Sequence, residues 1–128
     1  MNILITGIHG FVGSNLTVAL KAKHKLYGLD IISPERPGVI NTFSWNELPK
    51  IEYIPIDAII HLAGKAHDNK NISETSSYFE INTELTRTIY NYFLESSTKT
   101  FIFFSSVKAA ADRVEGELLN EEVVPNPV

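Results

Sequence analysis

The sequence contains no cysteine, which excludes disulfide bonds and thiolate chemistry and fits a reducing compartment. Basic residues are also few, because 11 Lys and Arg stand against 15 Asp and Glu, and the formal net charge is -4. Without a basic face to offset phosphate repulsion, we expect neither nucleic acid nor a membrane surface as a partner. No apolar run is long enough to span a bilayer, and no signal segment opens the chain. We therefore expect a cytoplasmic protein.

Hydrophobic residues make up 44% of the 128 positions, which is enough for the core of one domain. Three glycines are the most informative feature of that domain. Gly7, Gly10 and Gly13 recur at three-residue spacing, directly after an apolar segment, where a strand would lead into a helix. Such a turn exposes backbone N–H groups, and the positive end of the following helix favours an anion such as a nucleotide pyrophosphate. The alternative is a tight turn that serves only close helix–strand packing.

An acidic residue follows the glycines at the spacing that dinucleotide binding needs. Asp30 ends the second apolar segment, and the fingerprint places an acid roughly 20 residues beyond its glycines. Its carboxylate can accept hydrogen bonds from the adenosine ribose hydroxyls, and it would repel the additional phosphate of NADP. Asp30 therefore favours NAD as the cofactor, with a solvated carboxylate at a strand end as the alternative.

Apolar runs of strand length alternate with helical segments along residues 1–128, which is typical of βαβ units. The fold class predicted is α/β, a Rossmann-type doubly wound parallel sheet truncated after about five strands. Between the second and third strands, too few residues remain for a helical crossover, so we expect an irregular sheet there. The elements expected are strands Asn2–Thr6, Lys25–Asp30, Val39–Phe43, Ala58–Leu62 and Thr100–Ser105, helices Gly13–Ala22 and Ser76–Glu95, and a short turn Trp45–Leu48.

Small residues follow the fourth strand in the string His61-Leu62-Ala63-Gly64, and they would let a cofactor approach the backbone at the sheet's switch point. Further along come Asn82, in Phe-Glu-Ile-Asn-Thr, and the string Phe-Phe-Ser-Ser-Val-Lys over residues 103–108. Together with the glycines and Asp30, these motifs resemble the extended short-chain dehydrogenase/reductase family. The likeness is to nucleotide-sugar epimerases and dehydratases of the UDP-hexose 4-epimerase kind.

The resemblance implies the roles of individual residues. Three glycines match the family's pyrophosphate loop, Ala63 and Gly64 match the residues on the nicotinamide side, and Asn82 matches a helix asparagine that supports the active-site backbone. The cofactor-binding residues implied in this way are Gly7, Ile8, Gly10, Phe11, Val12, Gly13, Asp30, Ala63, Gly64 and Asn82.

Ser106 stands at the position of the family's catalytic serine or threonine, whose hydroxyl contacts the sugar oxygen that is oxidised. Its neighbour Ser105 is the other candidate, and the alternative for Ser105 is a buried serine that caps the strand end. Lys65 and Lys108 are candidates to face the substrate, with solvated loops as the alternative. The four histidines show no helical pair spacing, so we predict no metal site.

Two departures from the family's pattern stand out. The Tyr-x-x-x-Lys motif expected after the serines is missing, because all five tyrosines precede Ser105. We therefore expect residues 1–128 to be the amino-terminal part of a longer enzyme that acts on a nucleotide sugar such as a UDP-hexose, and to be inactive alone; a homodimer is left open. The alternative is a non-catalytic NAD-sensing module. Second, Ser44 stands where many members carry an acid that contacts adenine, and it either accepts a weaker hydrogen bond or caps a turn.

Overall fold

Five parallel strands form a single sheet in the order β3-β2-β1-β4-β5, which confirms the predicted fold class. The computed structural model describes residues 1–65, 75–106, 120–122 and 124–125, with side chains in the second helix described from residue 81 onward. The chain first builds outward from β1 through β2 to β3 and then returns to the other side of β1. The elements are β1 Asn2–Thr6, α1 Phe11–Leu20, β2 Lys25–Leu29, β3 Val39–Phe43, the 3-10 helix η1 Trp45–Tyr53, β4 Ala58–His61, α2 Thr75–Glu95 and β5 Thr100–Phe103.

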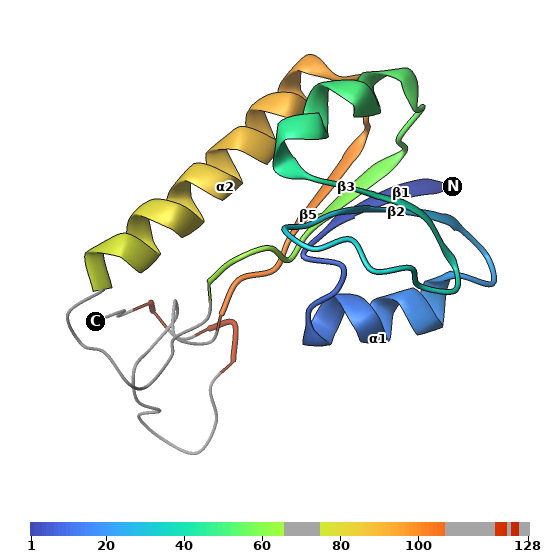
Figure 1. Cartoon of the computed structure of the whole chain (residues 1–128). Coiled ribbons are helices and arrows are strands. Elements are labelled where there is room, and N and C mark those ends of the chain that lie inside the picture. The colour runs from blue at the N-terminus through green and yellow to red at the C-terminus, as the bar shows by residue number, and fades with distance from the viewer. Residues whose placement is uncertain (66–74, 107–119, 123, 126–128) are drawn as a thin grey trace.

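Helices cover the two faces of the sheet in separate layers, with α1 on one face and α2 and η1 on the other (Figure 1). Successive strand residues point to opposite faces, so β1 contributes to both cores. Leu4 lies in the cluster under η1 and α2, whereas Ile3 and Ile5 lie in the cluster under α1. The sheet's centre therefore has an apolar cluster on each side, as is typical of a parallel sheet.

Strand ends fall slightly short of the predicted ones. β2 ends at Leu29, β4 at His61 and β5 at Phe103, so Asp30 and both candidate serines lie just beyond the ladder. The predictions extended these strands because polar residues can continue an apolar run without a visible break. Asp30 and the two serines therefore lie at the carboxyl edge of the sheet.

Other predicted boundaries also differ, most of all at the start of α1 and at the end of η1. α1 begins at Phe11 rather than Gly13, because extended Gly10 is already the N-cap and its carbonyl accepts the Ser14 N–H at 2.9 Å. η1 runs to Tyr53 instead of ending as a short turn. Leu48 and Ile51, which are three residues apart and buried, account for that extension, since this spacing places both side chains on one face of a 3-10 helix.

The connection from β2 to β3 contains no helix, as predicted. The two strands still pair in parallel, but the register shifts between Leu26 and Tyr27. Gly38, with a φ of 94°, leads the chain back into β3. A Cβ on Gly38 would lie 2.6 Å from the Lys21 side chain, so the returning loop runs close to the end of α1.

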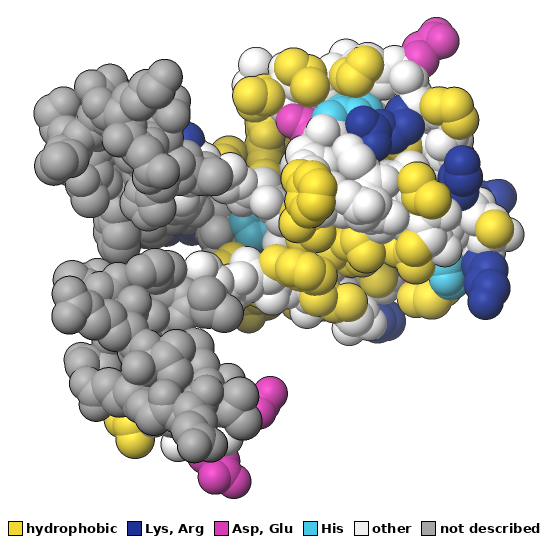
Figure 2. Space-filling model, turned by 90° about the horizontal axis from the view of Figure 1, so that it is seen from below, with side chains coloured by type: hydrophobic (Ala, Val, Ile, Leu, Met, Phe, Trp, Pro, Cys, Tyr) yellow, Lys and Arg dark blue, Asp and Glu magenta, His cyan; other side chains and the backbone are white. Residues whose placement is uncertain are grey.

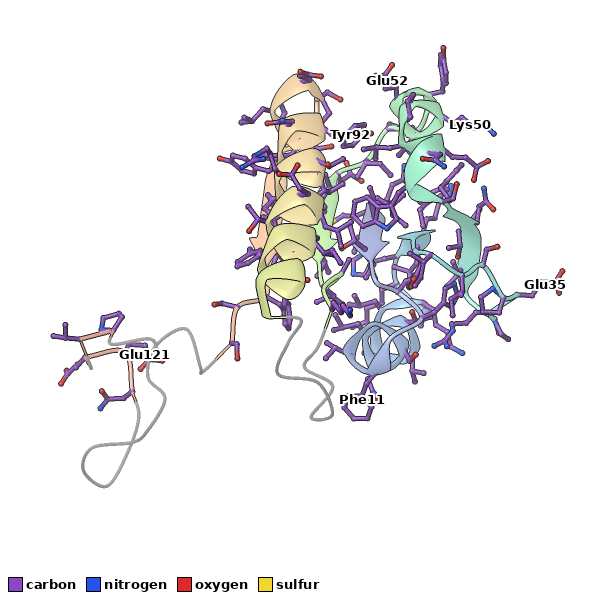
Figure 3. All side chains as sticks on the ribbon, turned by 60° about the vertical axis from the view of Figure 1, so that its left-hand side comes forward. Phe11, Glu35, Lys50, Glu52, Tyr92 and Glu121 are labelled. Atoms are coloured by element: carbon purple, nitrogen blue, oxygen red, sulfur yellow. The ribbon has the colours of Figure 1, made fainter. Side chains whose placement is uncertain are left out.

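Apolar side chains lie exposed on the face of the molecule that α1 occupies (Figure 2). Phe11 is 87% exposed and Val18 is 68% exposed, and Figure 3 shows Phe11 pointing away from the sheet. None of the described helices combines the length and the apolar composition that crossing a membrane requires.

Candidate functional site

The first glycine of the turn brings the exit of β1 against the exit of β4. Gly7 has a φ of 67°, the left-handed region that favours glycine, and its N–H donates to the Leu29 carbonyl at 2.9 Å. A Cβ at this position would lie 3.0 Å from both Cα and N of Ala63. Gly7 thus allows the close approach of the two strands that flank the reversal point of the sheet.

Gly13 and Gly10 lack side chains for different reasons. A Cβ on buried Gly13 would come within 2.5 Å of the Gly7 carbonyl oxygen and 2.6 Å of the Ile8 Cα, so α1 can lie over the turn only with glycine there. Gly10 is exposed, and the nearest atom to a Cβ would be the Gly7 carbonyl oxygen at 3.2 Å. Packing therefore demands glycine at position 13, whereas at position 10 the absent side chain leaves the outer surface of the turn open.

The start of α1 lies at the carboxyl edge of the sheet. The first turn of a helix leaves N–H groups without intrahelical acceptors, and the helix dipole adds positive potential. Residues Phe11 to Gly13 occupy that turn. The Ile8 side chain is fully buried in the core, so only the backbone of Ile8 can face a ligand. This edge fits an anionic group of small width.

Asp30 joins the exit of β2 to the glycine turn. Its Oδ2 accepts the N–H of His9 at 2.9 Å, and its Oδ1 accepts the N–H of Ile31 at 2.7 Å. A carboxylate has about four lone-pair sites, so each oxygen can accept a further hydrogen bond. The carboxylate is half-buried and faces the same edge as the glycines, which suits a ligand that carries hydroxyl groups beside its phosphates.

His9 extends this cluster to β3, since its Nε2 lies 3.0 Å from Thr42 Oγ1. Burial lowers the pKa of His9, while the negative charge of Asp30 acts to raise it and the positive charge of Arg36 acts to lower it. The imidazole therefore favours its neutral form beside the carboxylate. The spacing of the glycines pointed to the turn but gave no signal for this side chain.

The backbone segment that follows β4 is hydrogen-bonded to a side chain of α2. Asn82 Oδ1 accepts the Lys65 N–H at 2.6 Å, and Asn82 Nδ2 donates to the Lys65 carbonyl at 3.2 Å. A Cβ on Gly64 would lie 3.3 Å from the same Oδ1. Asn82 thus contacts the backbone of the segment that follows the switch point, and Lys65 itself is exposed.

The candidate serines follow β5 at the same edge. His61 is the ladder partner of Phe103, and the Phe104 N–H donates to the His61 carbonyl at 3.2 Å, so β5 leaves the sheet beside β4. Ser105 and Ser106 come next and are both exposed, which excludes the buried strand-end cap considered for Ser105. Lys108 lies outside the described residues.

Three polar residues that the motifs did not assign lie beneath this edge. Thr6 Oγ1 is 2.7 Å from His61 Nδ1, and His61 Nε2 is 3.0 Å from Thr86 Oγ1. Burial lowers the pKa of His61. A signal was present, since Thr6 and His61 are polar residues that directly follow apolar runs in β1 and β4, and Thr86 is one helical turn from Asn82.

Ser44 serves as the N-cap of η1. Its N–H and its hydroxyl both donate to Glu47 Oε2, at 3.0 and 3.1 Å, and Lys50 Nζ lies 2.7 Å from Glu47 Oε1. These partners lower the pKa of Glu47 to about 2, with the bond from Lys50 as the largest cause. The capping alternative for Ser44 is the one that these contacts favour. Within the described ranges, no group of three His, Asp or Glu side chains could hold a metal ion.

Residues 3–127 match the family described as the NAD dependent epimerase/dehydratase family. The GDP-6-deoxy-D-mannose reductase of Pseudomonas aeruginosa is 28% identical over 98% of this chain and 40% of its own length. The UDP-glucose 4-epimerase of Vibrio cholerae is 34% identical over 84% of this chain and 35% of its own length.

Among solved structures, the UDP-glucose 4-epimerase of Brucella ovis, in complex with NAD, superposes with a TM-score of 0.82. It is 21% identical, and the match covers 99% of this chain and 42% of that one. The chain thus spans about two fifths of the length of the relatives it matches.

Proposed function

This chain belongs to the NAD dependent epimerase/dehydratase family, and from that premise we propose that residues 1–128 form the NAD-binding part of a nucleotide-sugar epimerase or dehydratase. The activity proposed for the whole protein is that of a UDP-hexose 4-epimerase. One observation carries the proposal: the glycine turn, the start of α1 and the Asp30 carboxylate meet at the carboxyl edge of the sheet, where the strand order reverses.

The residues present fit NAD. The pyrophosphate would lie on the first-turn N–H groups of α1, over the open surface that Gly10 leaves. The adenosine ribose hydroxyls would donate to the oxygens of Asp30, which already fix the turn through His9. A carboxylate there disfavours the 2′-phosphate of NADP, so we propose NAD rather than NADP as the preferred cofactor.

The nicotinamide half would lie over the segment that follows β4, in which Ala63 and Gly64 present little side chain. Asn82 holds this segment through Lys65 and keeps it close to α2. The bound cofactor supplies reversible hydride acceptance, and the chain supplies its orientation.

Ser106 is the catalytic residue that we propose for the sugar chemistry. It is exposed at the carboxyl edge, two strands from the glycine turn, and its hydroxyl would hydrogen-bond the sugar oxygen that loses a proton. The tyrosine base of the family's motif is not among these residues, so we propose that residues 1–128 bind NAD but do not turn over a nucleotide sugar. Lys65 and Lys108 are the proposed substrate contacts.

Calorimetric titration of the 128-residue chain with NAD tests this function. We expect saturable binding of NAD, and weaker binding in Asp30→Ala, because the ribose loses its acceptor. Glu35→Ala is the matched control, since Glu35 is an exposed acid of the neighbouring loop. No heat of binding at about 1 mM NAD, the concentration that corresponds to about 4 kcal/mol of binding free energy, would contradict the proposal.

A further inference from the structure

A buried hydrogen-bond network connects the last residues of the two central strands. Thr6 ends β1 with 0% exposure, and His61 ends β4 with 2% exposure. The imidazole lies between Thr6 Oγ1 on one side and Thr86 Oγ1 of α2 on the other, at 2.7 and 3.0 Å. Buried polar groups of this kind are costly unless every member is satisfied.

Counting donors and acceptors fixes the direction of each bond. Thr6 Oγ1 accepts the N–H of Leu62 at 3.1 Å and the N–H of Ala63 at 3.0 Å. A hydroxyl oxygen has two lone pairs and one proton, so both acceptor sites are taken. The Thr6 O–H must therefore donate to His61 Nδ1, which must be unprotonated.

The protonation of the other ring nitrogen follows from that of Nδ1. A neutral imidazole with an unprotonated Nδ1 carries its proton on Nε2, and that N–H donates to Thr86 Oγ1. Burial, which lowers the pKa of His61, acts in the same direction, since it disfavours the imidazolium that would protonate Nδ1. Phe103 stacks on the ring at 5.8 Å between centroids and limits its rotation.

The network holds a defined piece of backbone. Leu62 and Ala63 follow the end of β4, and both of their N–H groups donate to Thr6 Oγ1. The Leu62 N–H is shared with the Thr6 backbone carbonyl at 3.3 Å, whereas Thr6 Oγ1 is the acceptor for Ala63. This places Ala63 where a Cβ on Gly7 would approach it to 3.0 Å. The Thr6 hydroxyl, whose proton is donated to His61, therefore extends the contact between β1 and β4 by one residue, to Ala63.

We propose that His61, in its Nε2–H tautomer, is a positioning residue for the cofactor segment: it orients the Thr6 hydroxyl, which fixes the Leu62–Ala63 backbone. The inference about the cofactor rests on the proposed function, because that function places the nicotinamide half over this segment. The tautomer and the fixed backbone are properties of the chain without any ligand.

Nitrogen-detected NMR of the histidine-labelled, ligand-free chain tests the tautomer at pH 7. We expect one protonated and one unprotonated ring nitrogen for His61, assigned as Nε2 and Nδ1, with cross-peaks lost in His61→Phe. A protonated Nδ1 would overturn the network as described, because two donors would then face each other at 2.7 Å.

Amide hydrogen exchange tests the positioning. Thr6→Val keeps the shape of the side chain and removes the hydroxyl, so we expect the Ala63 amide to exchange on the order of 10-fold faster or more, relative to amides of β2. The Leu62 amide should respond less, because it also donates to the Thr6 backbone carbonyl. Thr6→Ser keeps the hydroxyl and should restore slow exchange. Thr98→Val is the control, because Thr98 is a buried threonine at the opposite edge of the sheet.

NAD titration of the same variants separates the two proposals. We expect Thr6→Val to bind NAD on the order of 10-fold more weakly, the scale of one lost hydrogen-bonding group, with Thr6→Ser and Thr98→Val near the wild type. If the wild type bound NAD and Thr6→Val bound it equally well, the positioning of the cofactor segment would be refuted and the proposed function would stand. If the wild type bound no NAD, the proposed function and the cofactor role of His61 would both fail. The hydrogen-exchange and NMR experiments would still show whether the hydrogen-bond network exists.

Discussion

Asn82 holds both polar backbone groups of Lys65, accepting its N–H at 2.6 Å and donating to its carbonyl at 3.2 Å. A single amide side chain thereby binds the backbone of a residue that follows the end of β4. The contact connects α2 to the carboxyl edge of the sheet. Gly64 also lies close to Asn82, because a Cβ on Gly64 would be 3.3 Å from Asn82 Oδ1.

Removing this contact should affect stability and cofactor binding together. We expect Asn82→Ala to lower the free energy of unfolding by about 1–3 kcal/mol, since two hydrogen bonds are lost at net values of about 0.5–1.5 kcal/mol each. NAD affinity should fall as well. Asn91→Ala, on the exposed side of the same helix, is the control. Denaturant unfolding and calorimetry measure the two effects, and equal stability of the two variants would show that the Lys65 contacts contribute nothing.

Alanine substitutions of two glycines in the turn should separate an effect on stability from an effect on NAD binding. We expect Gly13→Ala to destabilise the chain by about 1–3 kcal/mol or more, the scale of overpacking, because its Cβ would meet backbone atoms at 2.5 to 2.6 Å. Gly10→Ala should cost under about 1 kcal/mol, since its one close neighbour is at 3.2 Å, yet weaken NAD binding about 10-fold through the blocked approach. Thermal unfolding with NAD titration decides this, and a Gly10→Ala variant that binds NAD normally would place the pyrophosphate elsewhere.

Sequence patterns predicted the order of the elements and the position of the glycine turn because periodicity and glycine spacing are local signals. The exact strand ends were harder to predict, because inter-strand hydrogen bonds continue past them. The N–H groups of Asp30 and Leu62 still donate to the carbonyls of Phe43 and Thr6, although β2 and β4 have ended. The Thr6–His61–Thr86 network joins residues 55 and 25 positions apart, and no local pattern carries such a pairing. The length of η1 likewise depends on tertiary burial of Ile51 rather than on propensity.

Cofactor selectivity should depend on the charge of Asp30. We expect the wild type to bind NAD more tightly than NADP, because the 2′-phosphate would approach a carboxylate. In Asp30→Asn the ratio of the two affinities should move toward NADP, while the amide oxygen can still accept one of the two backbone N–H bonds that hold the turn. Glu35→Gln changes the same charge in the adjacent loop and serves as the control. Equal affinities of the wild type for both cofactors would show that Asp30 does not meet the ribose.

The pKa of His9 should respond to its two charged neighbours in opposite directions. It is lowered from 6.5, chiefly by burial, so Arg36→Gln should raise it toward that value and Asp30→Asn should lower it further. Because the unfolded chain binds the proton more readily, the contribution of His9 to the free energy of unfolding decreases as the pH falls through 6.5. Arg36→Gln should reduce this dependence. Histidine titration by NMR measures the shifts, and an unchanged pKa in both variants would exclude the electrostatic coupling.

The two serines after β5 should differ in their effect on turnover. We expect Ser106→Ala in the full-length protein to lower the rate of nucleotide-sugar turnover by about 10²-fold or more, which is the usual scale for a positioned acid–base group. NAD binding should stay intact. Ser105→Ala should do much less, although both side chains are exposed at the same edge. A coupled assay with UDP-hexose measures the rates, and calorimetry checks NAD binding in each variant. If Ser105→Ala abolished turnover and Ser106→Ala did not, the serine motif would be displaced by one residue, and the hydroxyl that meets the sugar oxygen would belong to Ser105.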